Sequence, residues 1–325
     1  MAENAITTCD VKRQGVFMSE QTEKTLKLLK EYNNKNDDKI DIKTYEKMSR
    51  HTTFRIGGFA SLYLIPKTKE AVCAIFSVIR ETGIKYYLLG NGSNLVFPDE
   101  GYDGVVISTS ALSGIKIDGE KIISNSGTTL AALCKSARDN SLSGLEFAYG
   151  IPGSVGGAVY MNAGAYNGEM AFVLSESTYL DLLELRVHTI DNKAHKFGYR
   201  DSVYKHTDRF IISAEFSLRK DDRNAISERM NDFMKRRIDK QPLEYPSAGS
   251  VFKRYPGRYT GQMIEEAGLK GYTIGGAKVS EKHAGFIINQ GGATASNVKN
   301  LVEYIKNTIF EKFGCELECE IIFVK

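Results

Sequence analysis

Two glycine-rich segments of the sequence have the composition of loops that bind phosphate. GNGSN (90–94) follows an apolar stretch, and IPGSVGGAV (151–159) follows an aromatic one. Glycines lack a Cβ, so the backbone N–H groups around them can converge on phosphate oxygens without a cation. Neither segment is a G-x-G-x-x-G or a Walker A motif. A phosphate-bearing cofactor would therefore need a different architecture, and the alternative is that these glycines serve only tight turns and bulges.

Two polar residues outside these loops could take part in chemistry. Arg200, in GYRDSVYKH, carries a planar fork of donors that suits a carboxylate or a phosphate, although a salt bridge to Asp201 or another surface acid would use it equally well. Ser250 follows Gly249, where the chain can bend and present a hydroxyl, but a lone serine is ordinarily just a polar residue. A hydrolase nucleophile is disfavoured because the chain has no G-x-S-x-G motif.

Two charged segments allow both a structural and a functional interpretation. A strand predicted over 315–324 would place Glu316, Glu318 and Glu320 on one face. That face is either a polar outer surface or, for Glu320, the wall of a cleft. The run RRIDKQP (236–242) is typical of a solvated helix end whose cations complement the helix dipole.

The cysteines and histidines do not indicate a metal site. The five histidines lack metal-ligand spacing, and no second pair with histidine accompanies Cys315 and Cys319. The cysteines are scattered and odd in number, as expected for unpaired thiols in a reducing cytosol: Cys9, Cys73, Cys134, Cys315 and Cys319.

Length and composition predict a globular protein of two domains, or three small ones. The chain has 325 residues, 42% hydrophobic and 26% charged, at roughly 100–200 residues per domain. A net charge of +3, from 43 basic and 40 acidic residues, gives no indication of nucleic-acid binding. The longest apolar stretch, 71–79, is too short to span a bilayer, and the N-terminus lacks the apolar core of a secretory signal. We therefore expect a cytoplasmic protein.

The order of predicted elements indicates an α+β fold. Helices are predicted at 20–33, 69–83, 129–140, 224–239, 260–267 and 296–313. Strands lie between them, with a hairpin at 114–127 that turns at Asp118-Gly119. In the last helix, one apolar stripe predicts a face toward the core: Val298, Leu301, Val302, Ile305 and Ile309. The pattern breaks near 220 and, more weakly, near 110, while the first fifteen or so residues should be mobile.

Several long segments resemble one family. The matching motifs appear in order along residues 45–325: HTTFRIGG (51–58), LGNGSNLVF (89–97), GLEFAYGIPGSVGGAVYMNAGAYNGE (144–169), YRDSVYKH (199–206), KQPLEYPSAGSVFKR (240–254), IGGAKVSEKHAGFIIN (274–289) and FGCELECEI (313–321). Together they resemble the UDP-N-acetylenolpyruvoylglucosamine reductases (MurB), which make a peptidoglycan precursor.

The resemblance implies a two-subdomain FAD-binding fold of the vanillyl-alcohol-oxidase (PCMH) type with a C-terminal α+β substrate domain. The boundaries would be 1–45 for a partly flexible N-terminal extension, 46–110 and 111–220 for the FAD-binding subdomains, and 221–325 for the substrate domain. FAD would bind non-covalently, since GNGSN holds neither His nor Cys. Its contacts would be Gly90, Asn91, Gly92, Ser93, Asn94, Ile151, Pro152, Gly153, Ser154, Gly156, Gly157 and Ala158.

The resemblance also implies a reaction and its residues. NADPH would reduce the flavin, and the reduced flavin would transfer a hydride to C3 of UDP-N-acetylglucosamine enolpyruvate, giving UDP-N-acetylmuramate. By motif match, Arg200 would polarise the substrate carboxylate, Glu320 would be the catalytic carboxyl, protonated or sharing a proton, and Ser250 would deliver the proton to C2. Lys240 would contact the diphosphate, with Lys253 and Arg254 as weaker candidates.

The sequence also bears on the subtype within this family and on alternative functions. Arg200 and Ser250 are only 50 positions apart, so the chain resembles the shorter subtype, which lacks an insertion that closes over the substrate. Apart from the UDP-sugar, we expect no nucleic-acid or membrane partner, and a monomer is favoured. Two alternatives remain, a flavin oxidase or dehydrogenase with another substrate and a non-catalytic FAD- or UDP-sugar-binding paralogue. The presence of all three catalytic matches argues against both.

Overall fold

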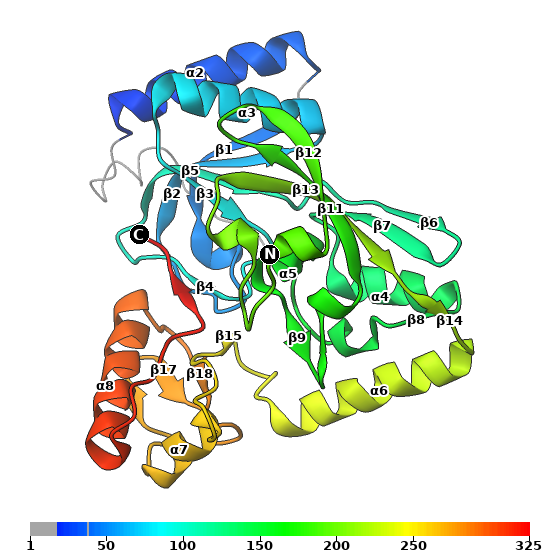
Figure 1. Cartoon of the computed structure of the whole chain (residues 1–325). Helices are drawn as coiled ribbons and strands as arrows, with labels where there is room; N and C mark the ends of the chain where they lie inside the picture. Colours follow the sequence, from blue (N-terminus) through cyan, green and yellow to red (C-terminus); the bar gives the residue numbers. More distant parts are fainter. Residues whose placement is uncertain (1–17, 38) are drawn as a thin grey trace, which may run out of the picture.

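The computed structural model describes residues 18–37 and 39–325, and it arranges them in three α+β units (Figure 1). The first fifteen residues, predicted to be mobile, lie outside the described ones. Each unit contains one of the three larger sheets. Four hydrophobic clusters form the cores, one of them centred on the third unit and one on the second.

The first unit is a four-stranded sheet with helices packed on one face. Its strand order is β1-β2-β5-β3, with β1 antiparallel to β2 and the other pairs parallel. The strands are β1 (Ile40–Lys47), β2 (Phe59–Pro66), β3 (Tyr86–Leu89) and β5 (Tyr102–Ser108), and the helices are α2 (Glu20–Lys35) and α3 (Lys69–Thr82). The helix predicted over 69–83 is confirmed as α3, which Thr68 caps at its start and Gly83, at φ 67°, ends.

Helix α2 and strand β1, which fall mostly in the predicted N-terminal extension, are integral parts of this first unit. Helix α2 packs against α3, and Leu29 of α2 is buried in the same core as Ile75 of α3. Strand β1 is an edge of the sheet, so the boundary predicted at residue 46 falls inside a strand. The polar composition of α2 concealed this, because only a narrow stripe of the helix is buried.

The second unit is an antiparallel five-stranded sheet in the order β12-β11-β13-β7-β6. Its strands are β6 (Ile115–Asp118), β7 (Lys121–Asn125), β11 (Leu174–Asp181), β12 (Arg186–Asp191) and β13 (Arg209–Ser217). The predicted hairpin at Asp118-Gly119 is confirmed as β6–β7. Helices and short strands accompany the sheet: α4 (Leu130–Asp139), β8 (Leu142–Ser143), α5 (Val155–Met161), β9 (Gly164–Ala165), β10 (Gly168–Glu169) and β14 (Arg219–Lys220).

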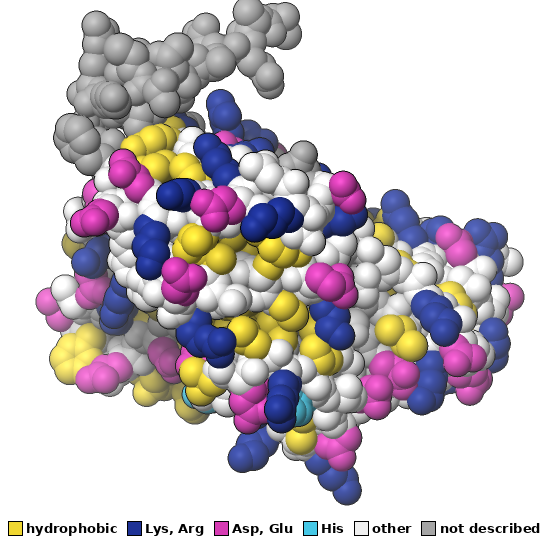
Figure 2. All heavy atoms as spheres, turned by 90° about the horizontal axis from the view of Figure 1, so that it is seen from above, with side chains coloured by type: hydrophobic (Ala, Val, Ile, Leu, Met, Phe, Trp, Pro, Cys, Tyr) yellow, Lys and Arg dark blue, Asp and Glu magenta, His cyan; other side chains and the backbone are white. Residues whose placement is uncertain are grey.

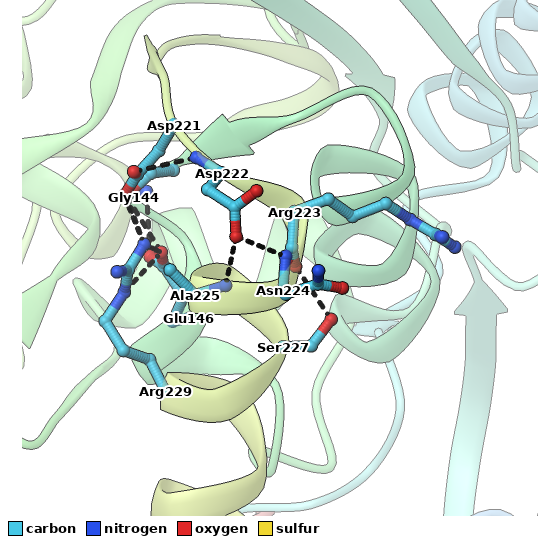
Figure 3. Close-up of polar contacts among 10 residues, drawn as sticks. Gly144, Glu146, Asp221, Asp222, Arg223, Asn224, Ala225, Ser227 and Arg229 are labelled. Atoms are coloured by element: carbon cyan, nitrogen blue, oxygen red, sulfur yellow. Dashed lines mark hydrogen bonds and ion pairs between the residues drawn. The ribbon is translucent and has the colours of Figure 1, made fainter.

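Helix α6 (Arg223–Lys240) also packs on the second unit, although the predicted boundary near 220 assigned it to the third. Its Ile226 and Met230 are buried in the core of the second unit. Arg229 donates from Nη2 to Glu146 at 2.8 Å and to Asp221 at 2.6 Å (Figure 3). Asp222 caps the helix by accepting from the amides of Asn224 and Ala225.

The third unit is a small antiparallel sheet in the order β15-β18-β17-β16, packed against α8. Its elements are β15 (Ser247–Ser250), α7 (Thr260–Glu266), β16 (Thr273–Ile274), β17 (Ala277–Val279), β18 (Phe286–Asn289) and α8 (Ala295–Phe313). The apolar stripe predicted for α8 is confirmed, because all five of its residues are buried. Asp99 of the first unit joins the two units by accepting from the amides of Ala295 and Ser296.

After α8 the chain returns to the first unit, as the red segment of Figure 1 shows. Only β19 (Ile322–Phe323) pairs as a strand, parallel to β4 (Leu95–Val96). The prediction of a continuous strand over 315–324 is therefore wrong. Residues 315–321 form no strand, and a single bridge, Phe252 to Cys319, is their strand-type pairing among the described residues.

The surface agrees with the balanced charge of the sequence. Figure 2, seen from above, shows basic and acidic side chains interspersed over one face, with small apolar areas between them. Lys24 of α2 and Glu81 of α3 form one such exposed pair at 3.2 Å. Within the described ranges, none of the helices has the length and hydropathy needed to cross a membrane.

Candidate active site

A cavity of about 610 Å³ lies where the three units meet. Both glycine-rich segments line it, and so do all three residues proposed from the sequence for catalysis: Arg200, Ser250 and Glu320. A lining drawn from segments some 230 positions apart indicates a site assembled by the whole fold rather than by one motif.

The two glycine-rich loops lie against each other at the C-terminal end of β3. The side-chain amide of Asn91 donates to the carbonyl of Pro152 at 2.7 Å. A Cβ added to Gly90 would lie 2.5 Å from Ser154 Oγ, so only glycine allows this approach. Ser154 itself begins α5 and accepts from the amide of Gly157. The loops, some 60 residues apart in sequence, thus form one continuous wall.

Gly92 is required by its conformation as well as by space. Its φ of 62° is left-handed, and a Cβ there would lie 2.0 Å from the carbonyl oxygen of His51. The amide of Thr53 in turn donates to the Gly92 carbonyl at 3.1 Å. The loop is therefore held against the HTTFRIGG segment.

The cavity wall contains buried polar atoms that lack hydrogen-bond partners in the described part of the chain, as expected of a site for a polar cofactor. Among the described residues, three buried side-chain oxygens have no hydrogen-bond partner: Thr109 Oγ1, Ser126 Oγ and Gln241 Oε1. All three residues line this cavity. Because buried polar atoms are almost always satisfied in a folded protein, a polar ligand is expected to complete them. The residues present therefore fit a nucleotide-type cofactor.

Arg200 is fixed in the cavity wall by hydrogen bonds to its side chain and to its backbone carbonyl. Its Nε donates to Glu320 Oε1 at 2.6 Å, and its Nη2 donates to the Gly164 carbonyl at 3.1 Å. The backbone is left-handed, with φ 56°, and Lys205 Nζ donates to its carbonyl oxygen at 2.6 Å. The sequence alternative, a salt bridge to Asp201, does not occur, because Asp201 pairs with His206.

Glu320 reaches the cavity through an irregularity in the returning segment. The amides of Glu320 and Ile321 both point to the Val251 carbonyl, at 2.8 and 3.4 Å. Two residues facing one is the pattern of a β-bulge, which bends a strand and redirects a side chain. Glu318 is exposed, whereas the Glu320 side chain is only 14% exposed. Asn94 of the first glycine loop supports this bend by donating to the Glu320 carbonyl at 3.0 Å.

Ser250 ends β15 and lies on the same cavity. Its strand pairs with β18 opposite Phe286, and the register shifts between Ser247 and Ser250. Gly249 lies within this shift with φ 81°, a conformation natural to glycine. The bend expected from the Gly249-Ser250 sequence is thus present, and it turns the strand end toward the cavity lining.

Of the three residues proposed to contact the substrate diphosphate, only one lines the cavity. Arg254 lines the cavity, and its amide donates to Tyr199 Oη at 3.3 Å. Lys240, at the end of α6, and Lys253, which pairs with Glu318, are not part of the lining. The polar lining residues that sequence reasoning missed include Lys205, Arg237 and Gln241. The signal that could have found the last two is their four-residue spacing, which places them on one helix face.

Comparisons with known proteins agree with this geometry. The model of the UDP-N-acetylenolpyruvoylglucosamine reductase C-terminal domain matches residues 241–324, and that of an FAD binding domain matches 60–190. A reductase of that name from Clostridium botulinum (strain Okra / Type B1) is 46% identical over 276 residues, covering 85% of this chain and 90% of the relative. One from Clostridium novyi (strain NT) is 44% identical over 88% of this chain and 93% of the relative.

The chain belongs to the UDP-N-acetylenolpyruvoylglucosamine reductase family. A solved structure of the MurB reductase from Thermus caldophilus agrees, with a TM-score of 0.75 at 33% identity, over 88% of this chain and 99% of that one. The predicted fold class, FAD-binding subdomains followed by a C-terminal domain, is confirmed. Membership in the MurB family also confirms the predictions of an FAD-dependent reductase of peptidoglycan synthesis with NADPH as co-substrate.

Proposed function

We propose that this cavity reduces the enolpyruvyl group of UDP-N-acetylglucosamine enolpyruvate, with Arg200, Ser250 and Glu320 as its catalytic residues. The observation that carries the proposal is the 2.6 Å contact between Arg200 and Glu320, two residues 120 positions apart, on a cavity that Ser250 and both glycine loops also line. When bound, FAD supplies the redox chemistry, taking a hydride from NADPH and giving one to C3 of the substrate.

Arg200 provides preorganised positive charge for the substrate carboxylate. Reduction at C3 builds enolate-like negative charge next to that carboxylate, and fixed donors there lower the barrier. A guanidinium has five N–H donors, of which Glu320 and the Gly164 carbonyl each take one. The remaining donors are available to the substrate, while the two internal contacts keep the guanidinium from rotating.

Glu320 and Ser250 have complementary roles in handling the proton. Glu320 orients Arg200 through Oε1, which leaves its second oxygen able to share a proton with the carboxylate of the reacting substrate. Ser250 gives its hydroxyl proton to C2. A serine is a weak acid, so its effect depends on being held next to a high-energy enolate, a position that pairing of Ser250 with Phe286 at the end of β15 supports.

The glycine loops are proposed to hold the FAD diphosphate through backbone N–H groups. Supporting observations are the close approach of Gly90 to Ser154 and the unpartnered hydroxyls of Thr109 and Ser126 in the same lining. Arg254, with Lys240 and Lys253 as the outer candidates, is proposed for the substrate diphosphate. We also propose a cytoplasmic monomer, for which light scattering of the purified protein is the test of the oligomeric state.

One experiment separates the proposed reaction from its alternatives. The purified full-length protein should be yellow, and its oxidation of NADPH should depend on added UDP-N-acetylglucosamine enolpyruvate. A yellow protein whose oxidation of NADPH ignores that compound would indicate a flavin oxidoreductase with another substrate. A protein that binds FAD and the UDP-sugar without turnover would be the non-catalytic paralogue.

A further inference from the structure

The C-terminal end of α6 contributes two side chains to the cavity that the catalytic scheme does not use, one from its last turn and one from its C-cap residue. Arg237 and Gln241 both belong to the lining, whereas Lys240 between them is exposed and does not. The Gln241 amide donates to the Arg237 carbonyl at 2.9 Å, so the helical hydrogen bonding extends to Gln241. Residues four apart on a helix lie on one face, and this face is turned to the cavity.

Arg237 is a half-buried cation without an acidic partner among the described residues. Its aliphatic stem packs beside Gly150, which directly precedes the second glycine loop, since a Cβ added to Gly150 would lie 2.9 Å from Arg237 Cδ. Burial lowers the pKa of its guanidinium, and Tyr166 opposes this only in part. Arg200, in the same cavity, is neutralised by Glu320. A buried guanidinium in a cavity wall therefore indicates a ligand that offers it an acceptor.

Gln241 has the opposite requirement. Its Oε1 is buried without any donor in the described residues. A buried carbonyl-type oxygen needs an N–H or O–H partner, so the ligand that meets Gln241 must donate. Phosphate and carboxylate groups carry acceptors alone, and either would place an oxygen against the Gln241 oxygen.

The position of α6 brings this pair close to the catalytic residues. Tyr166, in the turn between β9 and β10, stacks on Phe233 of α6 with ring centroids 4.6 Å apart and planes 3° apart. Gly164 of the same hairpin accepts from Arg200. One hairpin therefore holds both the last turns of α6 and the guanidinium of Arg200.

We propose that Arg237 and Gln241 bind the imide edge of a pyrimidinedione ring, in which a carbonyl oxygen stands next to an N–H. The guanidinium would donate to the carbonyl, and Gln241 Oε1 would accept from the N–H. Given the proposed function, on which this inference rests, two ring systems carry such an edge, the flavin of the cofactor and the uracil of the UDP-sugar. Within the segment RRIDKQP, Arg237 and Gln241 would then make the main contacts with the ligand.

The test uses Arg237→Met and Gln241→Met in the full-length holoprotein, with Arg236→Met, an exposed arginine of the same helix, as the matched control. Equilibrium dialysis measures retention of FAD, and titration with UDP and with CDP measures the preference for uracil. CDP has the same ribose and diphosphate, but its cytosine replaces the imide edge. None of these readouts depends on turnover, so a failure of the proposed reaction would not be mistaken for a failure of this site.

If the site holds the flavin, either variant should weaken FAD retention by about tenfold or more, as expected for a hydrogen bond lost from a charged or buried group. If it holds uracil, FAD retention should persist while the preference for UDP over CDP disappears. Arg236→Met should preserve both readouts, because Arg236 lies outside the cavity lining and pairs with Asp232 on the surface. The proposal is overturned if both variants leave both readouts unchanged, or if UDP and CDP weaken by the same factor with FAD retained.

Discussion

Arg200 occupies a backbone conformation that only a supporting contact makes tolerable. A non-glycine residue at φ 56° costs about 1–3 kcal/mol unless its surroundings hold it there. Lys205 Nζ provides such support by donating to the Arg200 carbonyl. Burial lowers the pKa of the Lys205 ammonium, with Lys253 adding to this and Asp201, Glu320 and Glu318 opposing it, so Lys205 belongs to the charge balance of the site.

Lys205→Met should therefore lower kcat by about tenfold while leaving reduction of the flavin by NADPH unchanged. The variant keeps the length of the side chain but removes the donor, so Arg200 loses its fixed position beside Glu320. Stopped-flow absorbance separates the two half-reactions. Lys220→Met is the control, since Lys220 also donates to a backbone carbonyl, that of Asn140, but on the exposed surface. Equal slowing of both half-reactions would contradict the positioning role.

Ser250→Ala should slow transfer from the reduced flavin to the substrate by about 100-fold or more, the range of a lost general acid. Flavin reduction by NADPH should remain nearly intact, because the hydroxyl has no part in that step. The measurement is the rate of flavin reoxidation after adding the enolpyruvyl substrate. Loss of both half-reactions to the same extent would mean that the serine is structural.

At the scale of elements, the first glycine loop leaves no room for a side chain at Gly92. Gly92 and Gly119 have nearly the same left-handed φ, 62° and 60°, but a Cβ on Gly119 has nothing within 4 Å. Gly119→Ala should therefore cost only the backbone strain, about 1 kcal/mol of unfolding free energy. Gly92→Ala should cost about 1–3 kcal/mol more, because its Cβ collides with His51, and should also release FAD. Denaturant unfolding and FAD retention measure the two effects.

The elements also show which features a sequence can predict. Helix α3 was predictable because its start, its end and its apolar face are local, with Thr68, Gly83 and the 3.6-residue spacing agreeing. The same holds for α8 between Thr294 and Gly314. The bulge that turns Glu320 inward was not predictable, because it depends on Val251, about 70 positions away. Strict alternation favoured one face for all three glutamates.

The candidate site was predictable only as far as its motifs extend. Arg200, Ser250 and Glu320 came from resemblance and lie on one cavity. Arg237 lies outside the matching motifs, and Gln241, although inside the motif 240–254, received no role from it. The significance of both residues depends on which face of α6 is covered. The core face of that helix, with Ile226 and Met230, would fit either neighbouring unit equally well by sequence. Only the packing of Ile226 and Met230 in the three-dimensional structure shows that α6 belongs to the second unit.

At the scale of the whole molecule, Glu146, Arg229 and Asp221 tie α6 to the second unit. Burial alone would raise the pKa of the Glu146 carboxyl. Hydrogen bonds from its own amide, Arg229, the Gly144 amide and Ser143 outweigh burial, so the pKa lies below its usual range. Because the folded pKa is depressed, the stability this carboxylate adds is present above the unfolded pKa near 4.3 and is lost as the pH falls through the folded value.

Arg229→Met should lower the unfolding free energy at pH 7 by about 1–3 kcal/mol, since it leaves the buried Glu146 short of a donor. The difference from the wild type should shrink below about pH 4, where the carboxyl is protonated in both proteins. Arg236→Met on the same helix is the control, because its pair with Asp232 is exposed and worth about 0–1 kcal/mol. A difference that stays constant with pH would argue against this assignment.

The return of the chain from α8 to β4 has a consequence for how the protein matures. Asn94 leaves the ribosome long before Glu320, 226 positions later, yet the side-chain amide of Asn94 donates to the Glu320 carbonyl. Early domains fold during translation, so the glycine-loop wall can exist while Arg200 still lacks its carboxylate partner. A nascent chain of this protein should therefore gain the ability to hold its cofactor before it gains turnover.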